Sequence, residues 1–389
     1  MFWTKSRDEE NFQGDDGVKK TKVGILFGGK STEHEVSLQS AKNILDALDQ
    51  EKYEVTLIGI DKEGHWYLND NSRFLLRGDA SGQSLFTEGA KNVSLVPGSE
   101  NQQLVYTADQ SSVGDVDVDV DVIFPVLHGS YGEDGTIQGL LKLANIPFVG
   151  AGVLGSAIGM DKDVTKRILR DAGIPIAKFL VYYSWEQARI NFAEAVDQLG
   201  LPFFVKPANA GSSVGVSKVI NEAGFHAALQ GAFTFDNKLL IEEYVAGREI
   251  ECAVLGNEAP IASTVGEIIA QQDFYSYAAK YLDENGAVLE IPAKLPADLI
   301  QEVQRLAVKT FRALCCEGMA RVDFFLRQDN QLIVNEINTI PGFTKISMYP
   351  KLWEISGISY GALIDRLIQL ALERYGREQR LKTSYEIFR

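Results

Sequence analysis

The chain has 389 residues and a formal net charge of −15, and 45% of its residues are hydrophobic and 23% charged. This composition is typical of a globular protein of two or three domains, and it excludes collagen, a low-complexity polymer and, because no uncharged apolar run reaches ~18 residues, a membrane span. The acidic balance lacks the basic footprint of non-specific nucleic-acid binding, and three cysteines in so long a chain indicate a reducing compartment.

The N-terminal part of the chain predicts a parallel α/β sheet. Apolar runs at Val23–Phe27 and Tyr53–Ile60 predict buried strands, and apolar residues at helical spacing between them predict a helix over Val36–Leu48. Because two glycines follow the first strand, the order is strand, turn, helix, strand, which is a βαβ unit. The polar stretch from about 69 to 115 predicts an irregular segment, and Val116–Leu127 predicts a further strand.

The rest of the chain alternates helices and strands. The later predicted elements are helix Ile137–Leu143, strand Ile146–Val149, helix Lys162–Ala172, strand Leu239–Glu243, strand Gly247–Leu255, helix Leu299–Leu314 and helix Leu363–Tyr375. Changes of pattern divide the chain into a disordered tail over residues 1–21 and domains over residues 22–150, 151–245 and 246–389.

The first glycine turn formally matches a P-loop. Residues Gly24–Ser31 fit G-x-x-x-x-G-K-[ST], but Ile25–Phe27 continue a buried strand where a P-loop must arch over phosphates. We therefore reject a P-loop, and a P-loop nucleotide switch is only an alternative function. The turn also places Glu33 at a helix start, where it either favours the helix dipole or faces a ligand ammonium.

Three later loops are candidates for binding a ligand. Lys206–Gly215 combines a lysine suited to phosphate with glycines that let the backbone approach a ligand, although a surface turn would look the same. His128–Gly135 follows a predicted parallel strand, where loops form the ligand crevice. Phe274–Tyr281 is aromatic-rich, and Lys280 within it is either a second phosphate clamp on a mobile lid or part of a packed loop.

A hairpin near the C-terminus brings two carboxylates together. Met319–Leu326 and Gln331–Thr339 predict strands joined by a two-residue turn at Asp329-Asn330. In that register Asp323 lies opposite Glu336, on the same face of the hairpin.

The same register places Arg321 opposite Asn338 on this face. Facing carboxylates repel unless something neutralises them. Arg321 could do so as a structural partner. The stronger interpretation is Mg²⁺ held by the carboxylate and amide oxygens and by substrate phosphates, with Arg321 meeting charge that develops during a reaction.

Seven segments together resemble one family. In chain order they are Gly28–Ser37, His128–Gly135, Met160–Lys162, Lys206–Gly215, Ala279–Tyr281, Met319–Asp323 and Asn335–Gly342. Each is weak alone, but seven in family order are specific. The chain resembles the D-alanine–D-alanine ligases of the ATP-grasp superfamily. The resemblance implies an α/β (α+β) ATP-grasp fold of three domains, with a Rossmann-like parallel α/β domain first and ATP between the last two.

The resemblance also implies the site residues. Those implied to be catalytic are Glu33, Ser212, Tyr281, Arg321 and Gly342. Those implied to border the two D-alanines are His128, Ser347 and Met348. Those implied to bind ATP are Lys162, Lys206, Glu242, Glu243, Tyr244, Val245, Glu249 and Lys280. Those implied to hold two Mg²⁺ ions, for which Mn²⁺ can substitute, are Asp323, Glu336 and Asn338.

In this family pattern Glu33 would fix the ammonium of the first D-alanine, and Ser212 would bridge Glu33 to the lid residue Tyr281. Arg321 and the Gly342 N–H would stabilise the oxyanion. The resemblance implies that the chain joins two D-alanines to D-alanyl-D-alanine through an acyl phosphate, releasing ADP and phosphate. It further implies peptidoglycan precursor synthesis in the bacterial cytoplasm by a homodimer.

The closest alternative function is a D-alanine–D-lactate ligase. Ligases that form that ester tend to lack the tyrosine found here at 281, so the sequence favours the dipeptide. Besides the P-loop switch, a non-catalytic nucleotide-binding module is an alternative of a different class.

Overall fold

The computed structural model describes residues 19–69, 91–98, 104–107, 113–114, 119–270, 287–382 and 384. Nearly all of the predicted disordered tail lies outside these ranges, and so do the predicted lid residues Lys280 and Tyr281. Among the described helices, none is by itself long and apolar enough to span a membrane, although one pair bent by 104° passes on length and composition.

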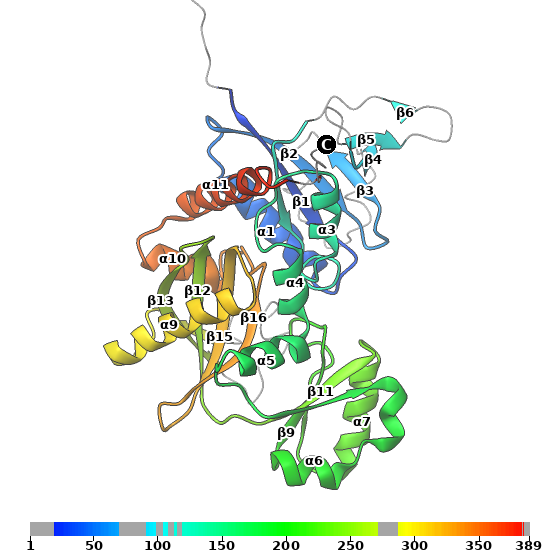
Figure 1. Ribbon diagram of the computed structural model, residues 1–389, viewed down its shortest axis with the longest axis vertical. Helices are drawn as coiled ribbons and strands as arrows, with labels where there is room; N and C mark the ends of the chain where they lie inside the picture. The colour runs from blue at the N-terminus through cyan, green and yellow to red at the C-terminus, as the bar shows by residue number, and fades with distance from the viewer. Residues whose placement is uncertain are drawn as a thin grey trace, which may run out of the picture.

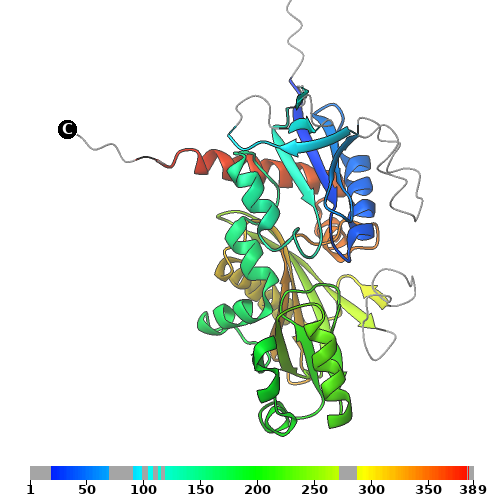
Figure 2. The same ribbon diagram turned by 90° about the vertical axis from the view of Figure 1, so that its right-hand side faces the viewer.

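The described strands form three sheets, stacked along the long axis of the molecule (Figures 1 and 2). In the first sheet the parallel strands are β1 (Thr21–Gly28), β2 (Tyr53–Ile60) and β7 (Val122–Val126). The antiparallel strands are β3 (Trp66–Asn69), β4 (Lys91–Leu95), β5 (Leu104–Thr107) and β6 (Val113–Gly114). Their order is β6-β5-β4-β3-β2-β1-β7.

The predicted βαβ unit is confirmed, because α1 (His34–Ala47) connects the parallel neighbours β1 and β2. The prediction of an irregular segment from about 69 to 115 is wrong for residues 91–95, 104–107 and 113–114, which form β4, β5 and β6, and the rest of that segment lies almost wholly outside the described residues. These strands are two to five residues long, which is too short for period-2 alternation to stand out. The rejection of a P-loop is confirmed. Gly24 pairs with Thr56 inside β1, where a Cβ would lie 2.5 Å from Ile123 Cδ1.

The second and third sheets are antiparallel. The second has the order β10-β9-β11-β8, from β8 (Phe179–Tyr183), β9 (Phe203–Pro207), β10 (Ser217–Val219) and β11 (Lys238–Glu243). The third has the order β14-β13-β12-β15-β16, from β12 (Arg248–Gly256), β13 (Ile261–Ala270), β14 (Ala287–Glu290), β15 (Gly318–Leu326) and β16 (Leu332–Asn338).

Helices cover these sheets or join them. Those of the middle region are α3 (Thr136–Leu143), α4 (Val153–Met160), α5 (Lys162–Asp171), the 3-10 helix Ser184–Arg189, α6 (Phe192–Leu199) and α7 (Glu222–Phe233). Those of the C-terminal region are α9 (Ala297–Ala313), α10 (Met348–Ile355) and α11 (Tyr360–Glu378). Two predictions need correction: α4 lies before the predicted helix Lys162–Ala172, where no helix was predicted, and the strand Ile146–Val149 reduces to one bridge between Ile123 and Phe148.

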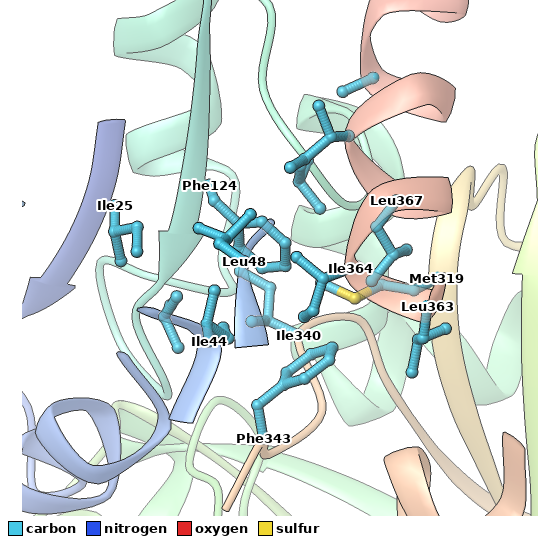
Figure 3. Packing of buried hydrophobic residues seen from close by; sticks show 14 of the residues in the cluster. Ile25, Ile44, Leu48, Phe124, Met319, Ile340, Phe343, Leu363, Ile364 and Leu367 are labelled. Carbon is cyan, nitrogen blue, oxygen red and sulfur yellow. The ribbon is translucent and has the colours of Figure 1, made fainter. Parts of the chain in front are cut away.

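The largest apolar cluster joins the two ends of the chain. It combines Ile44 of α1 and Phe124 of β7 with Phe343 and with Leu363 and Leu367 of α11 (Figure 3). Figure 1 shows α11, in red, lying against the N-terminal sheet. Arg374 of this helix is buried and donates hydrogen bonds to the carbonyls of two residues that follow the first sheet. The first sheet is therefore held in place by the C-terminal segment.

Candidate active site

Loops from distant parts of the chain converge on Glu33. This glutamate directly precedes α1 and is only 6% exposed. The Ser212 hydroxyl donates a hydrogen bond to Glu33 Oε1. A Cβ on Gly129 would lie 2.8 Å from Glu33 Oε2, and one on Gly211 would lie 2.9 Å from the same atom. The predicted contact between Glu33 and Ser212 is present, and glycine is required where the two loops press on this carboxylate.

His128 is buried beside Glu33 but contacts a different loop. Its Nδ1 lies 3.0 Å from the Ile340 carbonyl oxygen, and its Nε2 lies 3.4 Å from Ser40 Oγ. Burial lowers the pKa of the imidazole, and the charge of Glu33 opposes that shift only in part. The ring therefore links the histidine loop to the segment around Ile340, and its contact with a D-alanine stays a prediction.

Glu242 holds two buried lysines together. Lys206 Nζ donates to Glu242 Oε1 at 2.7 Å, and Lys166 Nζ lies 2.8 Å from Glu242 Oε2. Burial alone would raise the pKa of the Glu242 carboxyl, but the two lysines hold it below its ordinary value. Burial lowers the pKa of Lys166. The cluster carries two potential positive charges for one negative charge, which suits a site for a polyanion.

Lys162 lies one helical turn before Lys166 on α5, at the edge of the same cluster. Its Nζ donates to the Ala210 carbonyl at 2.6 Å and lies 3.9 Å from Glu336 Oε2. Burial lowers its pKa, while the charge of Glu336 opposes the shift. The structure thus brings Lys162 and Lys206 together and connects them to the hairpin carboxylates.

The predicted ATP ligands Glu242–Val245, which we call the hinge, connect the second and third sheets, because they lie where β11 ends and β12 begins. Glu243 accepts a hydrogen bond at 2.9 Å from the Lys178 backbone N–H. Tyr244 is 43% exposed, and Val245 is buried in a small apolar cluster. Glu249 lies on β12 beyond the hinge. The contacts of these residues with a nucleotide stay predictions.

The predicted face of the hairpin is confirmed: Asp323 pairs with Glu336, and Arg321 pairs with Asn338. The Arg321 Nε and Nη2 donate to the two Asp323 oxygens at 2.7 Å each, and Asn338 Nδ2 donates to Asp323 Oδ2 at 3.0 Å. Glu251 of β12, opposite Asp323, lies 2.9 Å from Arg321 Nε. Two carboxylates on neighbouring strands, those of Asp323 and Glu251, therefore share one guanidinium.

The hairpin fits a divalent cation by the type of its donors. Asp323, Glu336 and Asn338 offer the carboxylate and amide oxygens that Mg²⁺ prefers. Arg321 offsets only one of the negative charges of Asp323, Glu336 and Glu251. A cation would neutralise the excess. Among the described residues, no group of three or more His, Cys, Asp or Glu is arranged by itself to hold a metal ion. Mg²⁺ binding at this hairpin, with substrate phosphate oxygens as further ligands, stays a prediction.

The loop after β16 carries the remaining predicted residues. A Cβ on Gly342 would lie 2.8 Å from Ser347 Oγ, so a side chain here would displace that hydroxyl. Ser347 Oγ accepts a hydrogen bond from the Thr344 N–H at 2.9 Å and lies 2.8 Å from Thr344 Oγ1. Met348 begins α10 and is buried in the core. The predicted contacts of Ser347 and Met348 with the second D-alanine stay predictions.

Comparison with known proteins identifies the family. Residues 22–151 match the family model described as D-ala D-ala ligase N-terminus, and residues 168–369 match the one described as D-ala D-ala ligase C-terminus. The chain belongs to the D-alanine–D-alanine ligase family. It is 57% identical over 365 residues to a D-alanine–D-alanine ligase of Oceanobacillus iheyensis, covering 94% of this chain and 99% of the relative.

Solved structures of this ligase family have the same fold as this chain. The D-alanine–D-alanine ligase of Coxiella burnetii superposes with a TM-score of 0.81 at 40% identity, covering 93% of this chain and 96% of that one. The VanG D-Ala:D-Ser ligase of Enterococcus faecalis gives a TM-score of 0.80 at 35% identity, covering 91% and 100%. The predicted ATP-grasp fold and the predicted ligase function are confirmed, and the family uses D-alanine and ATP.

The sequence reasoning missed three charged residues of this ligase site: the buried Lys166 and Glu251 and the partly buried Glu133. Lys166 follows Lys162 by four residues on a predicted helix, so it shares a helix face with a predicted ATP ligand. Glu251 shares its strand face with Glu249. Glu133 accepts hydrogen bonds from the backbone N–H groups of Gly129 and Ile340. No local pattern separates it from a turn residue.

Glu133 gives the ligase a predictable pH dependence. Burial and the charge of Glu33 raise the pKa of Glu133 to about 8 from its ordinary value of 4.5. The folded chain therefore keeps a proton that the unfolded chain releases, so this carboxyl makes the free energy of unfolding fall as pH rises from about 4.5 to 8. Glu133→Gln should remove that fall. Urea unfolding at pH 5 and pH 8 checks this. A stability difference between variant and wild type that does not change with pH would contradict it.

Proposed function

We propose that this site joins two D-alanines at the expense of ATP, with the residue roles that the family pattern implies. The observation that carries this proposal is the position of Glu133. Its carboxyl interacts electrostatically with Glu33, Arg321 and Lys162, which are the groups proposed for the first D-alanine, the oxyanion and the ATP phosphates. One residue thus interacts with the groups proposed for all three parts of the reaction.

In the first step a carboxylate oxygen of the first D-alanine attacks the γ-phosphorus of ATP, forming an acyl phosphate and releasing ADP. Glu33 holds the ammonium of this D-alanine and so orients its carboxylate. Lys162 and Lys206 neutralise charge on the transferring phosphoryl group. Glu242 binds Lys206 directly, and Lys166 binds the other oxygen of Glu242, so together they keep Lys206 in place.

In the second step the amine of the second D-alanine attacks the acyl carbon, and inorganic phosphate leaves with the C–O bond electrons. Arg321 and the Gly342 N–H stabilise the oxyanion of the tetrahedral intermediate. Two Mg²⁺ ions, held by Asp323, Glu336 and Asn338, would supply neutralisation of phosphate charge. Tyr281 and Lys280 would close a lid that keeps water from the acyl phosphate.

The second substrate separates this proposal from its neighbours. A structural neighbour is named a D-Ala:D-Ser ligase, and the sequence leaves D-lactate as an alternative. Phosphate release from Mg·ATP should need no substrate other than D-alanine. When D-serine or D-lactate is added as well, mass spectrometry should still find D-alanyl-D-alanine as the dominant product. Preferential ester or D-alanyl-D-serine formation would overturn the choice of second substrate. Phosphate release that does not depend on D-alanine would overturn the ligase.

Domain organisation, assembly and location complete the proposal. The strands of the three sheets come from residues 21–126, 179–243 and 248–338, which supports domains at 22–150, 151–245 and 246–389. All three cysteines are free thiols, which supports the bacterial cytoplasm. A homodimer is expected, and light scattering at several concentrations tests it.

A further inference from the structure

Helix α1 buries a stripe of polar side chains. Its members recur every third residue along the helix and are His34, Ser37, Ser40 and Asn43, each at most 7% exposed. They lie beside Ile44 and other residues of the largest apolar cluster. Burying such groups is costly unless they are hydrogen-bonded, so alanine or leucine would suit a purely packing face better.

The first half of this stripe holds the loops around the first substrate position. His34 Nδ1 lies 2.9 Å from the Gly29 carbonyl oxygen. Ser37 Oγ accepts from the Gly28 N–H at 2.7 Å and donates to the Val126 carbonyl. The glycine turn after β1 and the end of β7 are thereby fixed to the helix that begins after Glu33.

The second half holds the loop that carries Gly342. Ser40 Oγ accepts from the Phe343 N–H at 3.2 Å, and Asn43 Nδ2 donates to the Phe343 carbonyl at 3.1 Å. The Tyr360 hydroxyl donates to the same carbonyl at 2.7 Å. The Phe343 ring is fully buried and points into the shared cluster (Figure 3). Residue 343 is therefore fixed through both its backbone polar groups and its side chain.

Ile340 is fixed in the same way from the other side. Its N–H donates to Glu133 Oε1 at 3.1 Å, and its carbonyl lies 3.0 Å from His128 Nδ1. Pro341 and Gly342 therefore lie between Ile340 and Phe343, whose backbone N–H and carbonyl groups are all bound by side chains. Of the five side chains that bind these groups, those of Ser40, Asn43 and His128 come from the chain before residue 130. Glu133 follows shortly after them, and Tyr360 belongs to α11. The position of the Gly342 N–H is set by the N-terminal domain.

We propose that Ser40 and Asn43 are positioning residues for peptide-bond formation, holding the Gly342 N–H where the oxyanion develops. This inference rests on the proposed oxyanion role of Gly342. Helix α1 then acts as a rigid spacer: its start presents Glu33 to the first D-alanine, and its second and third turns hold the oxyanion donor. The acyl phosphate forms without this donor, so the two chemical steps should depend differently on the stripe.

The test compares the two steps in Ser40→Ala and Asn43→Leu. Transfer of ¹⁸O between bridge and non-bridge positions of ATP reports reversible acyl phosphate formation, and mass spectrometry of the product reports the complete reaction. We expect the kcat for dipeptide to fall roughly 10- to 100-fold, the effect of misplacing a reacting group by about 1 Å. Isotope exchange and the KM for ATP should stay within about threefold.

Matched controls separate positioning from lost stability. Ser156 is a fully buried serine that bonds the Ala151 carbonyl, and Asn257 is a buried asparagine that bonds Leu370 and Gly318. Ser156→Ala and Asn257→Leu should lower the unfolding midpoint comparably without changing the ratio of isotope exchange to dipeptide formation.

Tyr360→Phe provides a milder variant should the first two unfold. It removes one bond to the Phe343 carbonyl and should shift the same ratio in the same direction, whereas Tyr349→Phe, which loses a bond to the Val254 carbonyl, should not. Exchange and dipeptide formation that fall in parallel would overturn the positioning role. A wild-type chain that forms no dipeptide would instead overturn the proposed function, and this inference with it.

Discussion

Replacing Arg321 by lysine should reduce the kcat for dipeptide formation by roughly 100- to 1000-fold, the range found when an oxyanion-stabilising donor is lost. The guanidinium binds both Asp323 oxygens at 2.7 Å and lies 2.9 Å from Glu251, so two carboxylates fix its plane. A lysine ammonium cannot reproduce this fork, and it would leave one carboxylate without its partner. Steady-state kinetics with varied ATP checks the prediction, and the KM for ATP should stay within about threefold.

A second arginine on the same sheet provides the control. Arg248 also binds a glutamate through two nitrogens, at 2.7 and 2.5 Å from the Glu267 oxygens, but this pair lies between β12 and β13. Arg248→Lys should leave kcat within about twofold. Equal losses in the two variants would mean that Arg321 matters for the sheet and not for the reaction. A loss confined to the KM for ATP would move Arg321 to nucleotide binding.

The hairpin that carries Arg321 shows how far sequence reasoning reached. A two-residue turn was expected, but Arg327 N–H bonds to the Gln331 carbonyl and Asn330 has a positive φ of 63°, so the turn holds three residues. The pairing is therefore one residue out of register, with Phe324 opposite Val334. A bulge then follows before Glu336, and it restores the expected pairing with Asp323. The carboxylate pair was predicted correctly because the two departures cancel.

Other parts of the site depend on contacts between distant segments, which no local pattern contains. The family motifs identified Glu33, Ser212 and Lys206, and the structure brings Glu33 and Ser212 into contact. No family motif contains Lys166, which is fully buried against Glu242. Its ammonium on α5 lies against Glu242 of β11, and only the fold brings these two segments together.

The polar stripe on α1 illustrates the same limit from the other side. Only His34 and Ser37 lie within a family motif, and a polar residue every third position normally indicates a solvated face. The face is buried because α11, from the far end of the chain, packs against α1 and closes the cluster around Phe343. Sequence patterning gives the period of a buried face, whereas tertiary packing decides which face is buried.

Replacing Glu33 by glutamine should raise the KM for the first D-alanine by roughly 100-fold while changing the KM for ATP little. The carboxylate is 6% exposed and enclosed by Gly129 and Gly211, so its charge acts on an ammonium with little screening by water. Truncating one partner of a buried charge pair costs about 2–5 kcal/mol, which corresponds to this loss. The amide keeps an oxygen for the Ser212 hydroxyl, so the effect isolates the charge.

The matched variant is Glu35→Gln, because Glu35 lies two residues away in the first turn of the same helix and forms an exposed ion pair with Lys62 at 2.7 Å. An exposed pair is worth about 0–1 kcal/mol at most, so both D-alanine constants should stay within about threefold. Initial rates over a wide D-alanine range separate the two binding events. If Glu33→Gln instead raised only the constant for the second D-alanine, the two substrate positions would have to be exchanged. Unchanged constants in a folded Glu33→Gln variant would place the ammonium at a group other than Glu33.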